Sequence, residues 1–406
     1  MSYPGTAKAL NRSERYGKRN AFNNRRRQNN SKDEPASEIR KRPEIRIGRV
    51  DHALVFIITL LVFLGFVMVF TSSIYIAENA FGDMYHFLRR QTLFIVMGFT
   101  AMFIMSTVSY QYLRRFVVPL YLVANALLIV VQVIGIAYGG ATRQLQVGGF
   151  VGQFQPLEIA KVSTILIMAL ILSNNKDLLK KWSGFFIACS IVMVTVALML
   201  RGGLSSSIIT AMAGFGIIFI ASPHVMRFVA LGAAGVAGIT GFILFAAQFR
   251  MERIQSWLDP FSDTSGASYQ IAQSLFSIAS GGIFGLGIGQ SRQRSFLPLA
   301  HNDFIFAIIC EELGLFGASV VLLLFGMLIW RGINIALKAP DAFGSYIAAG
   351  IVILIGSQTI INVAVVTNSI PNTGITMPLI SYGGTSFLIT MFLMGILLNI
   401  SRFSKS

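Results

Sequence analysis

The chain has 406 residues, of which 54% are hydrophobic and only 12% are charged, and its formal net charge is +16. Soluble domains usually carry about 25% charged residues, so this composition excludes a soluble enzyme, and the abundance of apolar residues excludes a disordered protein. Several continuous apolar stretches approach the roughly 20 residues that span a bilayer, which also excludes an outer-membrane barrel with its alternating pattern.

The first 50 residues form a basic, polar segment with almost no apolar periodicity. They hold 14 of the 33 Lys and Arg residues and 5 of the 17 Asp and Glu residues, a net charge of +9. This composition predicts a disordered cytoplasmic tail that rests on anionic lipid or binds a partner protein. A polar stretch of this length before the first apolar segment does not resemble a cleavable signal. Because no nucleic-acid-binding motif accompanies the charge, we expect no nucleic acid partner.

Ten apolar segments follow the tail. They predict an all-α integral membrane protein, a polytopic bundle of about ten transmembrane helices over residues 51–402. The segments are 54–76, 91–109, 116–138, 157–173, 184–200, 204–222, 226–248, 303–330, 343–366 and 382–401. Most links between them are short, but 139–156 and 249–302 are long, and the second is predicted to be a large outer loop between the seventh and eighth helices.

The basic tail also sets the predicted orientation. The positive-inside rule places the tail, and with it both termini, in the cytoplasm. Outside the tail the bias is weak, because about as many basic residues fall on the outer side as on the inner side. We therefore expect some of the outer ones to bind an anionic ligand. The outer set is Arg89, Arg90, Arg143, Arg201, Arg250, Arg253, Arg292 and Arg294.

Cysteine and histidine usage argues against several other classes of protein. The two cysteines lie in apolar segments and the four histidines are scattered, so neither a disulfide framework nor a metal site is predicted. The sequence contains no P-loop and no His-Glu-x-x-His motif, which disfavours an ATP-driven pump and an intramembrane metalloprotease.

The large outer loop is the richest segment in chemistry. Residues 250–270 combine arginines, Trp257, Asp259 and Asp263, and a glycine series follows at 281–289. Glycines let a backbone approach a ligand closely, and arginine forks bind phosphate. The alternative is an amphipathic loop with Trp257 and Phe261 at the membrane interface. The glycine series does not follow a predicted strand, so a dinucleotide site is not expected.

Two other links carry ionisable residues. Glu158 and Lys161 are three residues apart on a predicted helix and share one face, so they can form an ion pair, or Lys161 can meet an anionic head group. Asp303 stands at the start of the eighth span, as a helix N-cap or a functional carboxylate. Glu311 and Glu312 lie deeper in the same span, where ionisable groups are functional candidates.

The last link, residues 368–386, contains two prolines and three glycines between apolar residues. Broken backbone at membrane depth is tolerated only where it is buried in protein or lines a cavity. A re-entrant wall is therefore predicted, with a plain hairpin as the alternative.

Four of these motifs, taken in order, resemble the SEDS family, which includes FtsW, RodA and SpoVE. They are Gln-Pro-Leu-Glu-Ile-Ala-Lys at 155–161, the loop from Ser256 to Gln270, the run from Asp303 to Gly314, and Pro-Asn-Thr-Gly at 371–374 with the Ser381 region. Residues 362–368 look more like FtsW or SpoVE than RodA. Some positions depart from the family pattern, among them Gln144, Leu157 and Met377.

The resemblance implies a peptidoglycan glycosyltransferase that polymerises lipid II at the outer face of the cytoplasmic membrane during cell division, located at the septum. It places the essential acidic residue at Asp263 rather than Asp259, and the Asp263 carboxylate is expected to act as the general base. The implied substrate contacts are Arg143, Glu158, Lys161, Arg253, Tyr269, Gln270, Asp303 and Ser381. No permanent cofactor is implied, although a divalent cation, Mg²⁺ or Mn²⁺, could share the charge of the lipid pyrophosphate.

The implied partners are lipid II, the growing glycan strand, a class B penicillin-binding protein, other divisome proteins and membrane lipids. Three alternatives remain open at the level of sequence. The chain could be a lipid II flippase or permease, a sporulation-specific polymerase, or a scaffold for division proteins.

Overall fold

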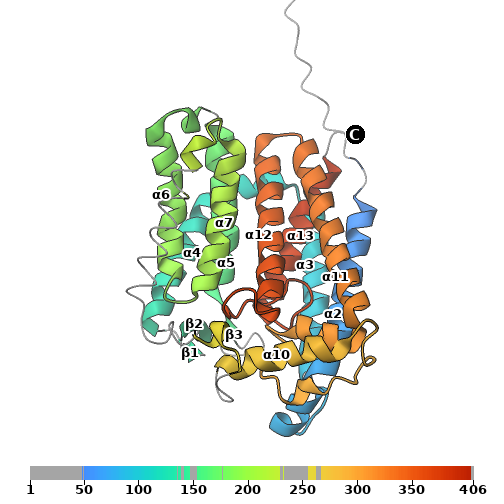
Figure 1. The fold of residues 1–406 in the computed structure, drawn as a ribbon. Helices are drawn as coiled ribbons and strands as arrows, with labels where there is room; N and C mark the ends of the chain where they lie inside the picture. Colours follow the sequence, from blue (N-terminus) through green and yellow to red (C-terminus); the bar gives the residue numbers. More distant parts are fainter. Residues whose placement is uncertain are drawn as a thin grey trace, which may run out of the picture. The chain divides into compact units, whose positions relative to one another are not determined.

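The structure, a computed structural model, describes Gly48 and residues 50–134, 136–138, 141–146, 153–175, 177–228, 232, 255–261 and 267–403 (Figure 1). Within these ranges, nine helices are long and apolar enough to cross a membrane. They are α2 (His52–Phe81), α3 (His86–Thr107), α4 (Leu113–Ile134), α5 (Pro156–Asn174), α6 (Trp182–Met199), α7 (Leu204–Ala221), α11 (Ile305–Lys338), α12 (Ala342–Val366) and α13 (Gly384–Arg402).

The prediction of an all-α, polytopic membrane bundle is therefore confirmed. The predicted span at 226–248 and the tail at 1–50 lie almost wholly outside the described residues. Two helix starts carry residues that favour a helix N-terminus. Pro156 opens α5, and the Asp51 carboxylate accepts a hydrogen bond of 3.1 Å from the Leu54 N–H at the start of α2.

The helices run side by side, and α10 (Ala267–Gly281) lies across one end of the bundle (Figure 1). We call this end the loop face. At the opposite end, the terminal face, the Gly48 N–H donates to the Arg402 carbonyl at 2.7 Å. The first and last described segments of the bundle thus lie at the same end.

The loop face also carries a small antiparallel sheet with the strand order β1-β2-β3 (Figure 1). Its strands are β1 (Ile136–Tyr138), β2 (Ala141–Gln146) and β3 (Gln153–Phe154). The expectation of a purely helical fold did not include this sheet. The pair Gly139-Gly140 between two short runs was its sequence signal, because two glycines commonly close a hairpin.

At the terminal face, Asp341 joins α12 to the start of α4. Its carboxylate accepts from the Tyr110 hydroxyl at 2.7 Å and from the Arg114 guanidinium at 2.8 Å. It also accepts from the Gly344 N–H at 3.1 Å, so it caps α12 as well. This one carboxylate fixes the relative position of two helices.

Between α12 and α13 the chain leaves the helical conformation and stays buried. Met377, Leu379 and Ile380 are at most 2% exposed. Ile380 contacts the middle of α2, where a Cβ on Gly65 would lie 2.6 Å from the Ile380 Cα and 2.8 Å from its carbonyl oxygen. The last link is therefore broken backbone that is buried in protein, which is the condition on which the prediction of a re-entrant wall rests.

The contact at Gly65 gives a test of this packing. Gly65→Ala places a methyl group against backbone that cannot rotate away, so we expect it to destabilise the protein by about 1–3 kcal/mol. Gly326→Ala is the matched control, because a Cβ on Gly326 in α11 would have nothing within 4 Å and alanine favours a helix. Thermal unfolding in detergent should show a lower Tm for the first variant only. Equal Tm values would contradict the close approach.

Candidate functional site

The motifs of the loop face meet on one stretch of chain, the end of α12 and the non-helical segment after it. We call residues 362–383 the hub. Hydrogen bonds join the hub to the start of α7, to the short helix at 255–258, to α10 and to the turn before α11. Segments that are up to 168 residues apart in sequence are thereby brought together.

The first junction is a reciprocal pair between Trp257 and Asn368. The Trp257 indole N–H donates to the Asn368 carbonyl at 3.0 Å, and the Asn368 amide donates to the Trp257 carbonyl at 3.2 Å. Asn368 has φ 55°, the left-handed conformation that asparagine tolerates better than most residues. The Ser369 and Asn368 N–H groups bond back to Ala364 and Val365, which is a Schellman ending of α12.

Trp257 therefore holds the outer loop to the hub. Phe261 follows four residues later and is exposed, with its ring 5.8 Å from that of Phe276 in α10. The loop at this point is fixed by Trp257 rather than by Phe261.

The second junction joins the hub to α10 and α7. The Asn372 amide donates to the Gln270 side chain at 3.2 Å, and the Ser274 hydroxyl donates to the Val366 carbonyl at 2.8 Å. The Ser205 hydroxyl donates to the Thr373 carbonyl at 2.6 Å. Tyr269 lies beside Gln270 in the first turn of α10 and is half-buried. The structure thus places Gln270 on the hub and Tyr269 next to it.

Asp303 belongs to the turn before α11, and the structure corrects its N-cap interpretation. The N-cap residue of α11 is Phe304, which makes no side-chain cap hydrogen bond. The Asp303 carbonyl instead accepts from the Asn362 amide at 2.8 Å, and the same amide donates to the Ile375 carbonyl at 2.6 Å. Because helix α11 starts two residues later than Asp303, this carboxylate stands before the helix rather than at its cap.

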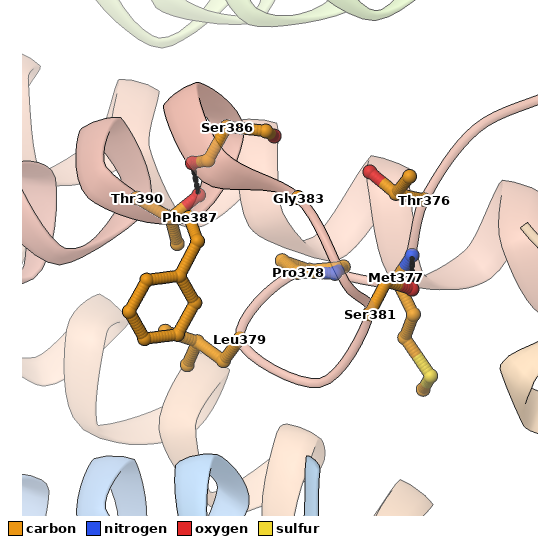
Figure 2. Close-up of a pocket in the computed structure, with 9 residues that line it drawn as sticks. All are labelled: Thr376, Met377, Pro378, Leu379, Ser381, Gly383, Ser386, Phe387 and Thr390. Atoms are coloured by element: carbon orange, nitrogen blue, oxygen red, sulfur yellow. Dashed lines mark hydrogen bonds between the residues drawn. The ribbon is translucent and has the colours of Figure 1, made fainter. Parts of the chain in front are cut away.

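Ser381 connects the same turn to the far end of the hub. Its hydroxyl donates to the Asn302 carbonyl at 2.7 Å and accepts from the Met377 N–H at 2.8 Å. Figure 2 shows this serine in a small pocket whose lining residues come from the hub and the first turns of α13. Since its one O–H proton is already donated, Ser381 could contact a substrate only as an acceptor.

His301 is buried beside this junction. Its ring lies 4.6 Å from Phe87 and 5.5 Å from Tyr382, and the Tyr382 N–H donates to the His301 carbonyl at 2.9 Å. Burial lowers the pKa of His301 to about 4, so its imidazole is neutral near pH 7. It contributes no positive charge to the loop face.

The predicted ion pair in α5 is confirmed. The Lys161 ammonium lies 2.7 Å from the Glu158 carboxylate, and the two side chains are only 3% and 10% exposed. The pair sits in the first turns of α5, at the loop face, next to α12 and α13. A buried pair of this kind supplies an ammonium whose charge one carboxylate already balances.

Three predicted site residues lie wholly or partly outside the described residues. Asp263 and Arg253 lie outside the described residues, and Arg143 lies in β2 with its side chain outside the described part. The described chain ends at Phe261 and resumes at Ala267. The junctions at Trp257 and Gln270 therefore lie on either side of the interval that contains Asp263.

Several polar atoms of the loop face have no hydrogen-bond partner among the described atoms although they are buried. They are His301 Nδ1, Asn302 Oδ1, Asn362 Oδ1, Asn368 Oδ1 and Thr373 Oγ1. All five belong to the hub or to the turn that it holds. Buried polar groups without partners are rare, and a polar ligand or bound water would satisfy them.

A metal ion would need several donor side chains close together. In the part of the chain that the structure describes, no three His, Cys, Asp or Glu side chains come close enough together to hold one. The described residues therefore offer no dedicated cation cage.

Comparison with known proteins decides the family. The sequence profile of the family of FtsW, RodA and SpoVE, described as "Cell cycle protein", matches residues 51–406. The chain belongs to this family. The match begins where the basic tail ends and includes every element of the loop face.

Two relatives illustrate the breadth of the family. The chain is 40% identical over 360 residues to stage V sporulation protein E of Bacillus subtilis strain 168, covering 87% of this chain and 98% of that protein. It is 37% identical over 361 residues to the probable peptidoglycan glycosyltransferase FtsW of Geobacter sp. strain M18, covering 88% and 98%. The family resemblance noted in the sequence is confirmed.

Solved structures share the fold. A chain in a structure described as the coordination of polymerization and crosslinking by a peptidoglycan synthase complex has a TM-score of 0.73 and 27% identity, with 87% of this chain and 98% of that chain covered. RodA of Thermus thermophilus has a TM-score of 0.64 and 25% identity, with 88% and 98% covered. The polytopic membrane architecture is that of the family.

Sequence reasoning missed the hub residues that hold the loop in place. Asn362 and Asn368 were seen only as part of a motif, and Trp257 was considered an interface residue. One signal was available for Asn368, because an asparagine followed by Ser-Ile-Pro at the end of an apolar helix favours a left-handed helix ending. Its partner in the outer loop could not be read from the sequence.

The Glu158–Lys161 pair gives a prediction about stability. Lys161→Met leaves a buried carboxylate without its partner, which typically costs about 3–5 kcal/mol, so we expect a marked loss of thermal stability. The double variant Glu158→Gln/Lys161→Met removes both charges and should recover most of the loss. Thermal unfolding of the two variants and the parent checks this. A double variant as unstable as the single one would show that the carboxylate is not the cause.

Proposed function

We propose that this chain is a peptidoglycan glycosyltransferase that polymerises lipid II into glycan strands at the outer face of the cytoplasmic membrane during cell division. The observation that carries the proposal is the hub. It holds the two stretches that flank Asp263 against a buried, polar end of a membrane bundle. A glycosyltransferase that acts on a lipid-linked sugar needs an acid–base group near the membrane surface, where the sugar lies.

The orientation supports an outer-face reaction. Gly48 and Arg402 meet at the terminal face, and residues 1–50, which carry a net charge of +9, precede the bundle in sequence. The positive-inside rule assigns this side to the cytoplasm. The loop face, with α10 and the hub, then faces outward.

The proposed reaction has one bond made and one broken. The Asp263 carboxylate takes the proton from the 4-hydroxyl of the acceptor sugar. The hydroxyl oxygen bonds to the anomeric carbon of the donor sugar, and the bond from that carbon to the pyrophosphate oxygen breaks. The lipid pyrophosphate leaves with the bonding electrons, and cationic side chains stabilise its charge.

The cations that we propose for this task are Arg143, Lys161 and Arg253. Glu158 already neutralises Lys161, so Lys161 would have to share its remaining donors with a phosphate oxygen. Any divalent cation would arrive with the pyrophosphate, since oxygen ligands from phosphates commonly complete such sites. Tyr269, Gln270, Asp303 and Ser381 are proposed sugar or lipid contacts.

The apolar part of the substrate needs a path beside the bundle. Between α2 and α3 a groove is lined by residues such as Phe63, Phe66, Ile95 and Phe99, with almost no polar surface. We propose that it receives acyl or polyprenyl chains. A groove of this chemistry suits hydrocarbon and excludes the charged head group.

The proposed partner is a class B penicillin-binding protein that cross-links the strands, together with other divisome proteins at the septum. One similar solved structure is of a peptidoglycan synthase complex, which supports a partnered polymerase. The sporulation alternative has the relative from Bacillus subtilis in its favour. Filamentation on depletion supports the division role, and a spore-cortex defect supports the alternative.

The catalytic assignment predicts that Asp263→Asn abolishes glycan chain formation. The amide cannot accept a proton, and loss of a general base typically lowers the rate by about 100-fold or more. The measurement is lipid II polymerisation by the purified protein with its transpeptidase partner, with Asp259→Asn as the matched control that should retain most activity. Undiminished polymerisation by Asp263→Asn would remove the assignment, and lipid II translocation in liposomes without polymerisation would favour a flippase.

The hub predicts a second, smaller effect on rate. Trp257→Phe removes the indole N–H that bonds to Asn368 but keeps an aromatic ring. One hydrogen bond contributes about 0.5–1.5 kcal/mol. We expect this free energy to hold the loop beside Asp263 in its active position, so its loss should raise the reaction barrier by the same amount and lower kcat about two- to tenfold. Tm should be nearly unchanged. Trp330→Phe, on the exposed surface of α11, is the control and should leave kcat unchanged. Equal kcat values for both variants would exclude a positioning role for Trp257.

A further inference from the structure

Helix α11 is broken within the described structure, nearer its start than its end. Gly314 has φ 67° and ψ −169°, which is not a helical conformation. In an unbroken helix the Leu315 and Phe316 N–H groups would donate to the Glu311 and Glu312 carbonyls. The break separates these four backbone groups from their helical partners.

The glycine series at 281–289 supplies new partners for all four groups. The Leu286 and Gly287 N–H groups donate to the Glu311 and Glu312 carbonyls at 2.9 and 3.0 Å. In the other direction, the Leu315 and Phe316 N–H groups each donate at 3.0 Å to the carbonyls of Gly282 and Ile283. The chain at 281–290, which we call the glycine hairpin, thus completes the backbone hydrogen bonding of α11.

This pairing requires glycine at the points of closest approach. A Cβ on Gly285 would lie 2.6 Å from the Gly314 nitrogen, and a Cβ on Gly314 would lie 2.3 Å from the Gly285 nitrogen. Both residues also have positive φ, 78° and 67°. The glycines that resembled a phosphate-binding loop in the sequence therefore serve backbone-to-backbone packing here.

The two acids of α11 anchor the chain that leaves the hairpin. The Glu311 carboxylate accepts from the Ser291 hydroxyl at 2.6 Å and from the Arg292 N–H at 2.9 Å. The Glu312 carboxylate accepts from the Thr71 hydroxyl of α2 at 3.0 Å. Both side chains are fully buried, so these acids fasten the hairpin to α11 and α2.

The outward side of the hairpin is apolar. Ile283, Phe284 and Ile288 are 64%, 81% and 60% exposed, and residues 281–290 contain no charged residue. Leu315 and Phe316, just beyond the break in α11, are each 64% exposed and continue the same apolar surface. About 20 helical residues span the hydrocarbon of a bilayer. If the membrane-spanning part of α11 ends just before Arg331, it begins near residue 311, so the break at Gly314 lies within it.

We propose that the glycine hairpin is a re-entrant element that inserts into the leaflet at the loop face, with Phe284 and its apolar neighbours in contact with lipid acyl chains. Backbone can lie in hydrocarbon only when its polar groups have partners, and the pairing with α11 provides them. The surface is continuous with the lipid-facing side of a membrane-spanning helix. The outer loop is thereby anchored in the bilayer on the side of α11.

The proposal is tested with a fluorescent label in nanodiscs, without any partner protein. Phe284→Cys is made in a Cys189→Ala/Cys310→Ala background and labelled with a thiol-reactive dye. Quenching by lipids that carry a nitroxide on the acyl chain is compared with quenching by aqueous iodide. Leu315→Cys is the control in the span, and Asp177→Cys is the control in water, since the Asp177 side chain is 80% exposed.

The expected ratio of lipid to iodide quenching at position 284 is that of position 315 and several-fold above that of position 177. A ratio closer to that of position 177 would overturn the proposal and leave the apolar surface for a partner protein. Ile288→Cys repeats the measurement on a second side chain, and monodisperse elution confirms folding of each variant. The readout does not use activity, so it is independent of the proposed reaction.

Discussion

Inside a bilayer, every backbone N–H and C=O group must find a partner within the protein, and this constraint decides where the chain can leave the helical conformation. Two departures from helix in the described structure satisfy this constraint. The hub between α12 and α13 is buried against α2, and the break in α11 is completed by the glycine hairpin. Both departures occur toward the loop face, and both use glycine where two backbones approach within contact.

These departures also assemble the candidate site. A regular helix end would present only its own last carbonyls. The hub instead forms hydrogen bonds with α7, the loop helix at 255–258, α10 and the turn before α11. Asn368 and Asn372 hold the two stretches that flank Asp263. The outer loop is long, but Trp257 and Gln270 within it bond to side chains of a segment more than 100 residues away.

The few ionisable side chains buried in the bundle also need partners within the protein. Burial of an unpaired charge is costly, so each buried carboxylate and ammonium described at the loop end has a defined partner. Lys161 is paired with Glu158, and Glu311 and Glu312 accept hydrogen bonds from neighbouring segments. Only the first of these pairs is local in sequence, and only that one was predicted with its partner. The glutamates of α11, which the sequence marked as functional candidates, attach the glycine hairpin to α11 and α2.

The sequence by itself determined the membrane class, most helix positions, the broken backbone of the last link and the family, because hydrophobic length and ordered motifs are local properties. It also predicted the Glu158–Lys161 pair, since residues three apart on a helix share a face. The small sheet, the start of α11 two residues after Asp303, the Trp257–Asn368 junction and the pairing of the glycine hairpin with α11 were decided only by the tertiary structure. Each of these depends on which distant segments become neighbours, and the spacing of residues along the chain carries no information about such long-range contacts.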